Sequence, residues 1–182
     1  RAVGDRLGEA NVLQAQGDVL AFLDQTDEAL ARYEEALRLY RAVGDRLGEA
    51  NVLQAQGDVL AFLDQTDEAL ARYQEALTLY RAVGARLGEA NVLLEQGDAA
   101  LRGGQIETGM GLLEQARQIY QRVGDRAGLS NVGIRLARFA ASQDDWERSI
   151  DLLQPAVDFC VEIGHPLGAQ LQAEIDEWRS QL

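Results

Sequence analysis

The stretch RAVGDRLGEANVLQAQGDVLAFLDQTDEALARYEEALRLY, residues 1–40, decides the fold, because a nearly identical copy follows it at once. Residues 41–80 match it at 38 of 40 positions, residues 81–120 keep 19 of those 40 residues, and residues 121–160 keep 10. Such a period is typical of solenoids, in which each unit packs against its neighbours. The sequence predicts a single domain over 1–182, with four repeats and a C-terminal capping helix at 166–182.

Each repeat contains two blocks of apolar residues at helical spacing. In the first repeat, one block is Leu7, Ala10, Leu13, Gly17 and Leu20, and the other is Ala29, Tyr33, Ala36, Leu37 and Tyr40. Between them lies a tight break, where Asp24 or Thr26 can cap the second helix. Gly44 recurs as Gly84, Gly124 and Gly164, and it can take the left-handed conformation that ends a helix.

This pattern predicts an all-α chain of antiparallel helix hairpins without β-strands. We expect helices over 6–23, 26–43, 46–63, 66–83, 86–103, 106–123, 126–142, 145–163 and 166–181.

The interlocking positions of the hairpin resemble the tetratricopeptide repeat. They are Leu13, Gly17, Leu20, Ala29, Tyr33 and Ala36. The 40-residue length is similar to the longer repeats of spindle-orientation adaptors, kinesin light chains and bacterial signalling proteins. The resemblance implies a right-handed superhelical solenoid whose concave groove, lined by the first helix of each hairpin, binds a peptide or helix of a protein partner.

One polar face of the first helices is the candidate binding groove, and we call it the polar ladder. Its members are Asn11, Gln14, Asp18, Asn51, Gln54, Asp58, Asn91, Asp98, Asn131 and Arg138. Amide side chains can hold the backbone groups of a peptide, and the aspartates favour a basic or neutral partner over an acidic one. The alternative is a solvated helix face that recurs because the repeat was copied.

A second face of the first helix carries Val12, Val19 and Leu23. Their counterparts Val52, Val59 and Leu63 should be buried against the preceding hairpin, whereas only residues 1–5 precede the first stripe. We expect this stripe to mediate self-association, either as a two-fold homodimer or by end-to-end stacking.

The acidic composition argues against several classes of partner. The formal net charge is −13, every basic residue is arginine, and no segment is basic. Nucleic acid and anionic membranes are therefore poor partners. No apolar run approaches the roughly 20 residues of a membrane span, and no signal-peptide pattern opens the chain. We expect a cytoplasmic protein, and the start at Arg1 suggests a fragment of a larger multidomain protein.

No constellation in the sequence indicates catalysis, a metal or a cofactor. Successive repeats should place Asp18, Asp58 and Asp98 about 10 Å apart, too far to share one ion. Cys160 and His165 are five residues apart, and a buried structural cysteine beside a loop histidine is the simpler interpretation than a nucleophile pair.

The sequence thus predicts a protein–protein interaction scaffold rather than an enzyme. Two alternatives stay open. One is a sensor solenoid attached to a bacterial nucleotide-hydrolysing or protease effector, and the other is an engineered repeat array without a natural ligand.

Overall fold

The computed structural model describes residues 3–182, and within this range all regular structure is helical. Its helices are α1 (Val3–Phe22), α2 (Thr26–Val43), α3 (Arg46–Phe62), α4 (Thr66–Val83), α5 (Arg86–Arg102), α6 (Ile106–Val123), α7 (Arg126–Ala141), α8 (Trp146–Glu162) and α9 (Leu167–Arg179). The expected all-helical repeat architecture is confirmed. No helix boundary lies more than three residues from the expected position.

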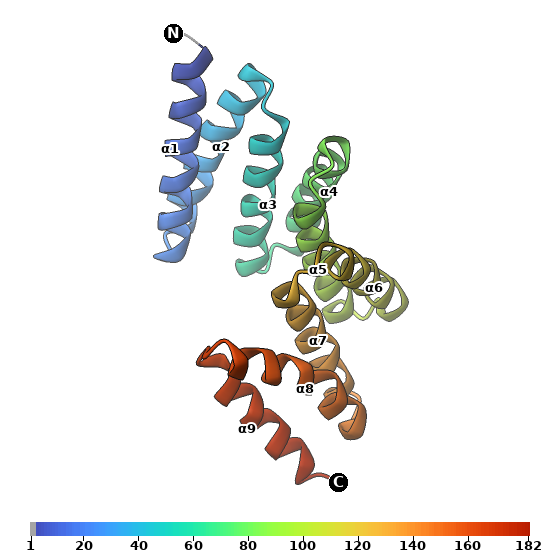
Figure 1. Ribbon diagram of the computed structural model, residues 1–182. Helices are drawn as coiled ribbons and strands as arrows, with labels where there is room; N and C mark the ends of the chain where they lie inside the picture. The colour runs from blue at the N-terminus through green and yellow to red at the C-terminus, as the bar shows by residue number, and fades with distance from the viewer. Residues whose placement is uncertain (1–2) are drawn as a thin grey trace. The chain divides into compact units, whose positions relative to one another are not determined.

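The chain divides into two compact units, and the division falls within α5. We call the first helix of each hairpin an A helix (α1, α3, α5, α7) and the second a B helix (α2, α4, α6, α8). In the first unit, up to Val92, α1 packs on α2, α2 on α3, and α3 on α4. Figure 1 shows α1, α2 and α3 side by side in blue and teal.

Tyrosines of the B helices pack directly over glycines of the A helices. A Cβ atom added at Gly17 would lie 2.5 Å from the Tyr33 ring, so this position admits no side chain. Tyr40 packs in the same way over Gly48 of the next hairpin, with even less space. One tyrosine thus closes its own hairpin, and the other joins two consecutive hairpins.

Glycines in the left-handed conformation follow the B helices α2 and α4, as the sequence predicted. Gly44 has φ 77° and Gly84 has φ 72°, and the N–H of each turns back to the last turn of its helix. The expectation that Asp24 or Thr26 caps α2 is wrong. Gln25 is the N-cap residue and makes no side-chain bond, whereas Asp24 takes φ 57° and ends α1. Asp64 and Asp144 repeat this conformation.

The interface between the first two hairpins buries most of the expected apolar stripe. Val52 is fully buried and Val59 is 6% exposed, as expected. Leu63, however, remains 37% exposed, because it lies past the last turn of α3 as its C-cap residue.

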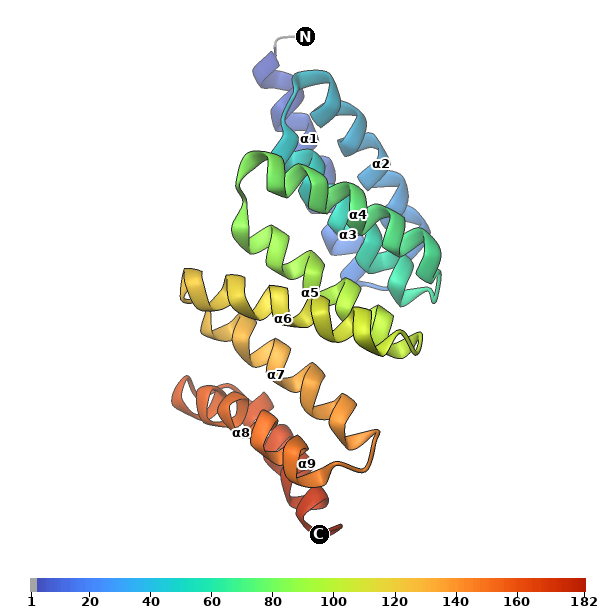
Figure 2. The same ribbon diagram turned by 90° about the vertical axis from the view of Figure 1, so that its right-hand side faces the viewer.

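In the second unit, α9 covers the hairpin formed by α7 and α8. Leu171, Ile175 and Trp178 of α9 are buried in a core cluster with Leu153 and Cys160 of α8. Figure 2 shows α8 and α9 side by side in red and orange. The apolar face of α9 thus completes the core of the α7–α8 hairpin.

Candidate protein-binding face

In the first unit, tyrosine hydroxyls from the B helices hold the polar ladder. The Tyr40 hydroxyl lies 2.7 Å from Asn11 Oδ1 and 2.8 Å from Gln14 Oε1. The Tyr33 hydroxyl donates to Asp18 Oδ1 at 2.8 Å. The sequence did not predict these bonds. Tyr33 and Tyr40 lie in the apolar block of the second helix, so both were expected to be core residues.

The second repeat has the same network. The Tyr80 hydroxyl lies 2.9 Å from both Asn51 Oδ1 and Gln54 Oε1, and the Tyr73 hydroxyl donates to Asp58 Oδ1 at 2.8 Å. All six ladder side chains of α1 and α3 therefore lie within hydrogen-bond distance of a tyrosine hydroxyl. Because a hydroxyl has a single proton, Tyr40 and Tyr80 can each donate to only one of the two amide oxygens that they face.

Burial raises the pKa of tyrosines that face the ladder. Burial, followed by the hydrogen bond to Asp18, raises the pKa of Tyr33. Burial is also the main reason why the pKa of Tyr80 rises to about 12, with a smaller contribution from the charge of Asp58. Tyrosine is protonated at neutral pH even at its ordinary pKa, so each hydroxyl can donate its one proton to a ladder oxygen.

Anchoring does not bury the ladder in the first unit. Asn11, Asp18, Asn51 and Asp58 are exposed, while Gln14 and Gln54 are half-buried. Each of these tyrosines contacts one carboxylate oxygen of its aspartate, and a carboxylate has two acceptor oxygens. This face therefore presents acidic and amide groups in fixed positions.

In the second unit, arginines of the chain itself pair with the ladder. Asp98 lies 3.2 Å from Arg102 and 3.7 Å from Arg135, which also contacts Glu95 at 3.3 Å. Arg138 pairs with Glu174 of α9 at 2.7 Å. Asn131 is exposed in this unit, and so is Asn91, which belongs to the first unit. The ladder thus differs in character between the units, with ion pairs in the second.

Two exposed aromatic side chains, which the sequence interpretation did not include, extend the ladder in the first unit. Phe22 is 86% exposed and Phe62 is 67% exposed. Each follows a ladder aspartate by four residues, so both lie on the ladder face of their A helix. That spacing was visible in the sequence and could have identified them.

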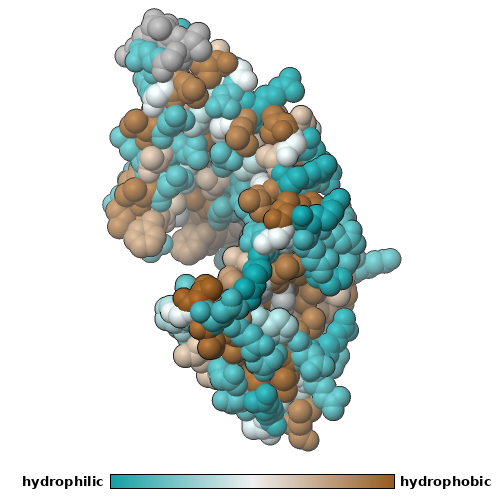
Figure 3. All heavy atoms as spheres, viewed as in Figure 1, coloured by the Kyte–Doolittle hydropathy of each residue, from teal (hydrophilic) through white to brown (hydrophobic). Residues whose placement is uncertain are grey.

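The stripe proposed for self-association lies on the surface of α1 and on Leu23, the residue that follows it. Val12 is 57% exposed, Val19 is 59% exposed and Leu23 is 57% exposed. In the space-filling view, hydrophobic side chains are scattered over the edge that α1 forms (Figure 3).

The Cys160 thiol is buried, and the His165 side chain is exposed. Cys160 is 5% exposed within the α7–α9 core, whereas His165 accepts a hydrogen bond from the backbone N–H of Leu167 through Nδ1. In residues 3–182, no group of three or more histidine, cysteine or acidic side chains could hold a metal ion. No helix in that range is long and apolar enough to cross a membrane.

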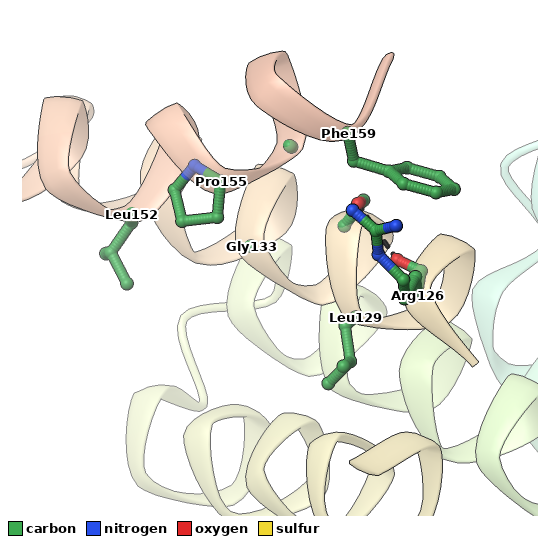
Figure 4. A pocket seen from close by; sticks show the side chains of 8 residues that line it. Arg126, Leu129, Gly133, Leu152, Pro155 and Phe159 are labelled. Carbon is green, nitrogen blue, oxygen red and sulfur yellow. Dashed lines mark hydrogen bonds between the residues drawn. The ribbon is translucent and has the colours of Figure 1, made fainter. Parts of the chain in front are cut away.

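A shallow pocket of about 210 Å³ lies between α7 and α8. Arg126, Gly133, Pro155 and Phe159 are among its lining residues (Figure 4). Arg126 lies over the Phe159 ring, 4.8 Å from Cζ to the centroid, and donates to both carboxylate oxygens of Glu162 at 2.8 and 2.6 Å. The pocket lining combines this arginine with mainly apolar groups.

Comparisons with known proteins agree with this architecture. Residues 8–82 match the model of the tetratricopeptide repeat family. No curated protein sequence matches the chain. BtubC (BKLC) from P. vanneervenii is 14% identical, with a TM-score of 0.66 over 100% of this chain and 84% of that chain.

Two further solved structures have the same fold. A candidate kinesin light chain from Podosopora anserina with nearly identical TPR-like repeats is 15% identical, with a TM-score of 0.70 over 94% of this chain and 85% of that one. A Signal Transduction ATPase with Numerous Domains from Pyrococcus horikoshii, which has a tetratricopeptide repeat sensor, is 15% identical, with a TM-score of 0.76 over 97% of this chain and 26% of that one.

Tetratricopeptide repeats generally mediate protein–protein interaction, and their fold is typically a non-catalytic scaffold. Residues 8–82 match the tetratricopeptide repeat family, and the described chain is an all-helical repeat solenoid with the fold of these solved structures.

Proposed function

We propose that this chain is an interaction scaffold that binds a basic or neutral peptide or helix along the polar ladder of α1 and α3. The observation that carries the proposal is the fixed position of Asp18 and Asp58, each held by a tyrosine hydroxyl at 2.8 Å while its side chain stays exposed. Groups that are positioned before binding lose less conformational entropy when a partner arrives.

Charge favours a basic partner for this face. Each of the first two repeats contributes an aspartate to the ladder and no basic residue, and the whole chain has a net charge of −13. Complementary charge accelerates association and discriminates against acidic competitors.

The test removes charge without removing the hydrogen-bond acceptor. In the double variant Asp18→Asn/Asp58→Asn, each amide oxygen can still accept from Tyr33 or Tyr73, so the melting temperature should stay near that of the parent protein. The Kd for an arginine-containing peptide should rise about tenfold, and less at high salt, because screening already weakens such contacts. Titration calorimetry at two salt concentrations measures both.

Tyr33→Phe is the matched control, since it removes the anchoring hydroxyl and keeps the charge of Asp18. It should loosen the carboxylate and weaken binding less than the loss of both charges. Equal Kd values for the parent protein and the double aspartate variant would leave only the solvated-face interpretation.

A sensor solenoid is the second candidate function, and the likeness to the Pyrococcus horikoshii protein favours it. This chain spans about a quarter of that protein, whose tetratricopeptide repeats are described as a sensor. The parent gene discriminates between the two functions, because a nucleotide-hydrolysing or protease domain encoded beside these repeats would support the sensor.

We also propose that the chain forms a two-fold homodimer through Val12 and Val19 of α1 and Leu23, which directly follows α1. In α3, the counterparts of the two valines are almost fully buried by the preceding hairpin, which indicates that this stripe favours a protein surface. End-to-end stacking on α9 is the weaker option. The exposed side chains of α9 include Gln170, Asp176 and Glu177, and they offer no apolar match.

Sedimentation across a range of concentrations tests the dimer. The variant Val12→Glu/Val19→Glu should be monomeric where the parent protein is dimeric, because it places four like charges in the interface. The variant Leu47→Glu/Leu87→Glu adds the same charge at two other exposed leucines and should still dimerise. A parent protein that stays monomeric at high concentration would rule the dimer out.

A further inference from the structure

The first two repeats pair an aspartate with an exposed phenylalanine on one helix face. Asp18 precedes Phe22 by four residues in α1, and Asp58 precedes Phe62 by four residues in α3. Residues at this spacing lie about 5–6 Å apart between their Cβ atoms. An anionic group and an aromatic ring are therefore presented together, twice, on two A helices that contact each other.

Burial in the hairpin core does not explain the phenylalanines. Among the side chains that the structure describes, Phe22 is the most exposed large hydrophobic one, at 86%, and Phe62 is 67% exposed. Tyr33 holds the neighbouring Asp18 carboxylate, so one component of each pair has a fixed position while the ring remains accessible.

The second unit shows which side chain fits such a pair. On α8, Phe159 and Glu162 are three residues apart on one face, and Arg126 of α7 binds both of them. The guanidinium carbon lies 4.8 Å from the centre of the ring, and two N–H groups reach the carboxylate at 2.8 and 2.6 Å. Figure 4 shows Arg126 next to the Phe159 ring. A planar guanidinium can stack on a ring and bind a carboxylate at the same time.

The third repeat provides a second internal example at the ladder itself. The residue four positions after Asp98 is Arg102 instead of phenylalanine, and it pairs with Asp98 at 3.2 Å. Arg135 of the next A helix approaches the same carboxylate at 3.7 Å. In the third repeat, two arginines of the chain itself therefore pair with the ladder aspartate.

We infer that Asp18 with Phe22, and Asp58 with Phe62, are two arginine-binding sites for a partner segment that carries a pair of arginines. The inference rests on the proposed function of the ladder and names the side chain that the ladder selects. Neighbouring packed helices lie roughly 10 Å apart. An extended chain advances about 3.3 Å per residue, so arginines three residues apart would reach both sites.

The experiment compares three synthetic peptides of the same length, in which two arginines, two lysines or two citrullines stand three residues apart in a glycine–serine background. Titration calorimetry at low salt measures each Kd. The arginine peptide should bind about tenfold more tightly than the lysine peptide, because lysine matches the charge but not the planar geometry. The neutral citrulline peptide should bind most weakly.

Phe22→Leu/Phe62→Leu is the decisive variant, since leucine keeps an apolar side chain and removes the ring. It should raise the Kd of the arginine peptide about tenfold and change that of the lysine peptide less. Both positions are exposed, so helicity and melting temperature should not change. The variant Leu47→Ala/Leu87→Ala, at two other exposed positions, should bind like the parent protein.

Two outcomes separate this inference from the proposed function. If Asp18→Asn/Asp58→Asn weakens binding while the leucine variant and the lysine peptide behave like their parents, the ladder binds basic segments without selecting arginine, and the inference is overturned. If neither set of variants changes any Kd, the proposed function fails as well.

Discussion

Ala85 lies immediately before α5, at the position where two other A helices have an aspartate as their N-cap residue. Asp45 accepts hydrogen bonds from the N–H groups of Leu47 and Gly48, and Asp125 accepts one from Gly128. Ala85 has the same place before α5, as the bond from the Glu89 N–H to its carbonyl shows, but it has no side-chain acceptor. Ala85→Asp should therefore raise the free energy of unfolding by about 1 kcal/mol.

Chemical denaturation measures this change, and Asp45→Ala is the matched reverse substitution. It should lower the free energy of unfolding by a similar amount, because it leaves two N–H groups without their acceptor. Loss of stability in Ala85→Asp would mean that the start of α5 differs from that of α3.

At the scale of the helices, local chemistry in the sequence was enough to predict where most of them begin and end. Gly44 and its copies predicted the ends of the B helices, because a left-handed residue is readily provided by glycine. The ends of the A helices were harder to interpret. Asp24 is both a good N-cap residue and one of the few non-glycine residues that tolerate positive φ, and only the folded turn decides between these roles.

The exposure of the polar ladder in α1 was predictable from the sequence, but its hydrogen bonds were not. Helical spacing correctly separated Asn11 and Asp18 from the apolar faces, since that separation depends only on the 3.6-residue period. The bonds from Tyr33 and Tyr40 depend on how closely two helices approach over Gly17 and Gly48, which is a tertiary property. For the same reason, the pairing of Asp98 with Arg135 of another repeat was not evident.

At the scale of the whole chain, composition makes the tyrosines dominate the response to alkaline pH. The chain contains no lysine and five tyrosines, and its remaining basic residues are arginines and one histidine. Arginine stays protonated to above about pH 12, and carboxylates are already ionised. Apart from the single thiol and the terminal amine, only the phenols titrate between roughly pH 9 and 12.

Stability should therefore fall as pH rises above about 10. Burial raises the pKa of Tyr33, Tyr40, Tyr80 and Tyr120 in the folded chain, and that of Tyr80 reaches about 12. Below about pH 10, folded and unfolded chains both keep these protons, so stability is complete. Between about pH 10 and 12, the unfolded chain releases phenolic protons that the folded chain retains, which favours unfolding.

Circular dichroism and phenolate absorbance, recorded together, should show helix loss and proton release in one transition. Tyr33→Phe/Tyr80→Phe should make the free energy of unfolding depend less steeply on pH in this range. Phenolate formation at its ordinary pKa with helicity intact would show that the hydroxyls are not held as the hydrogen bonds to the ladder require.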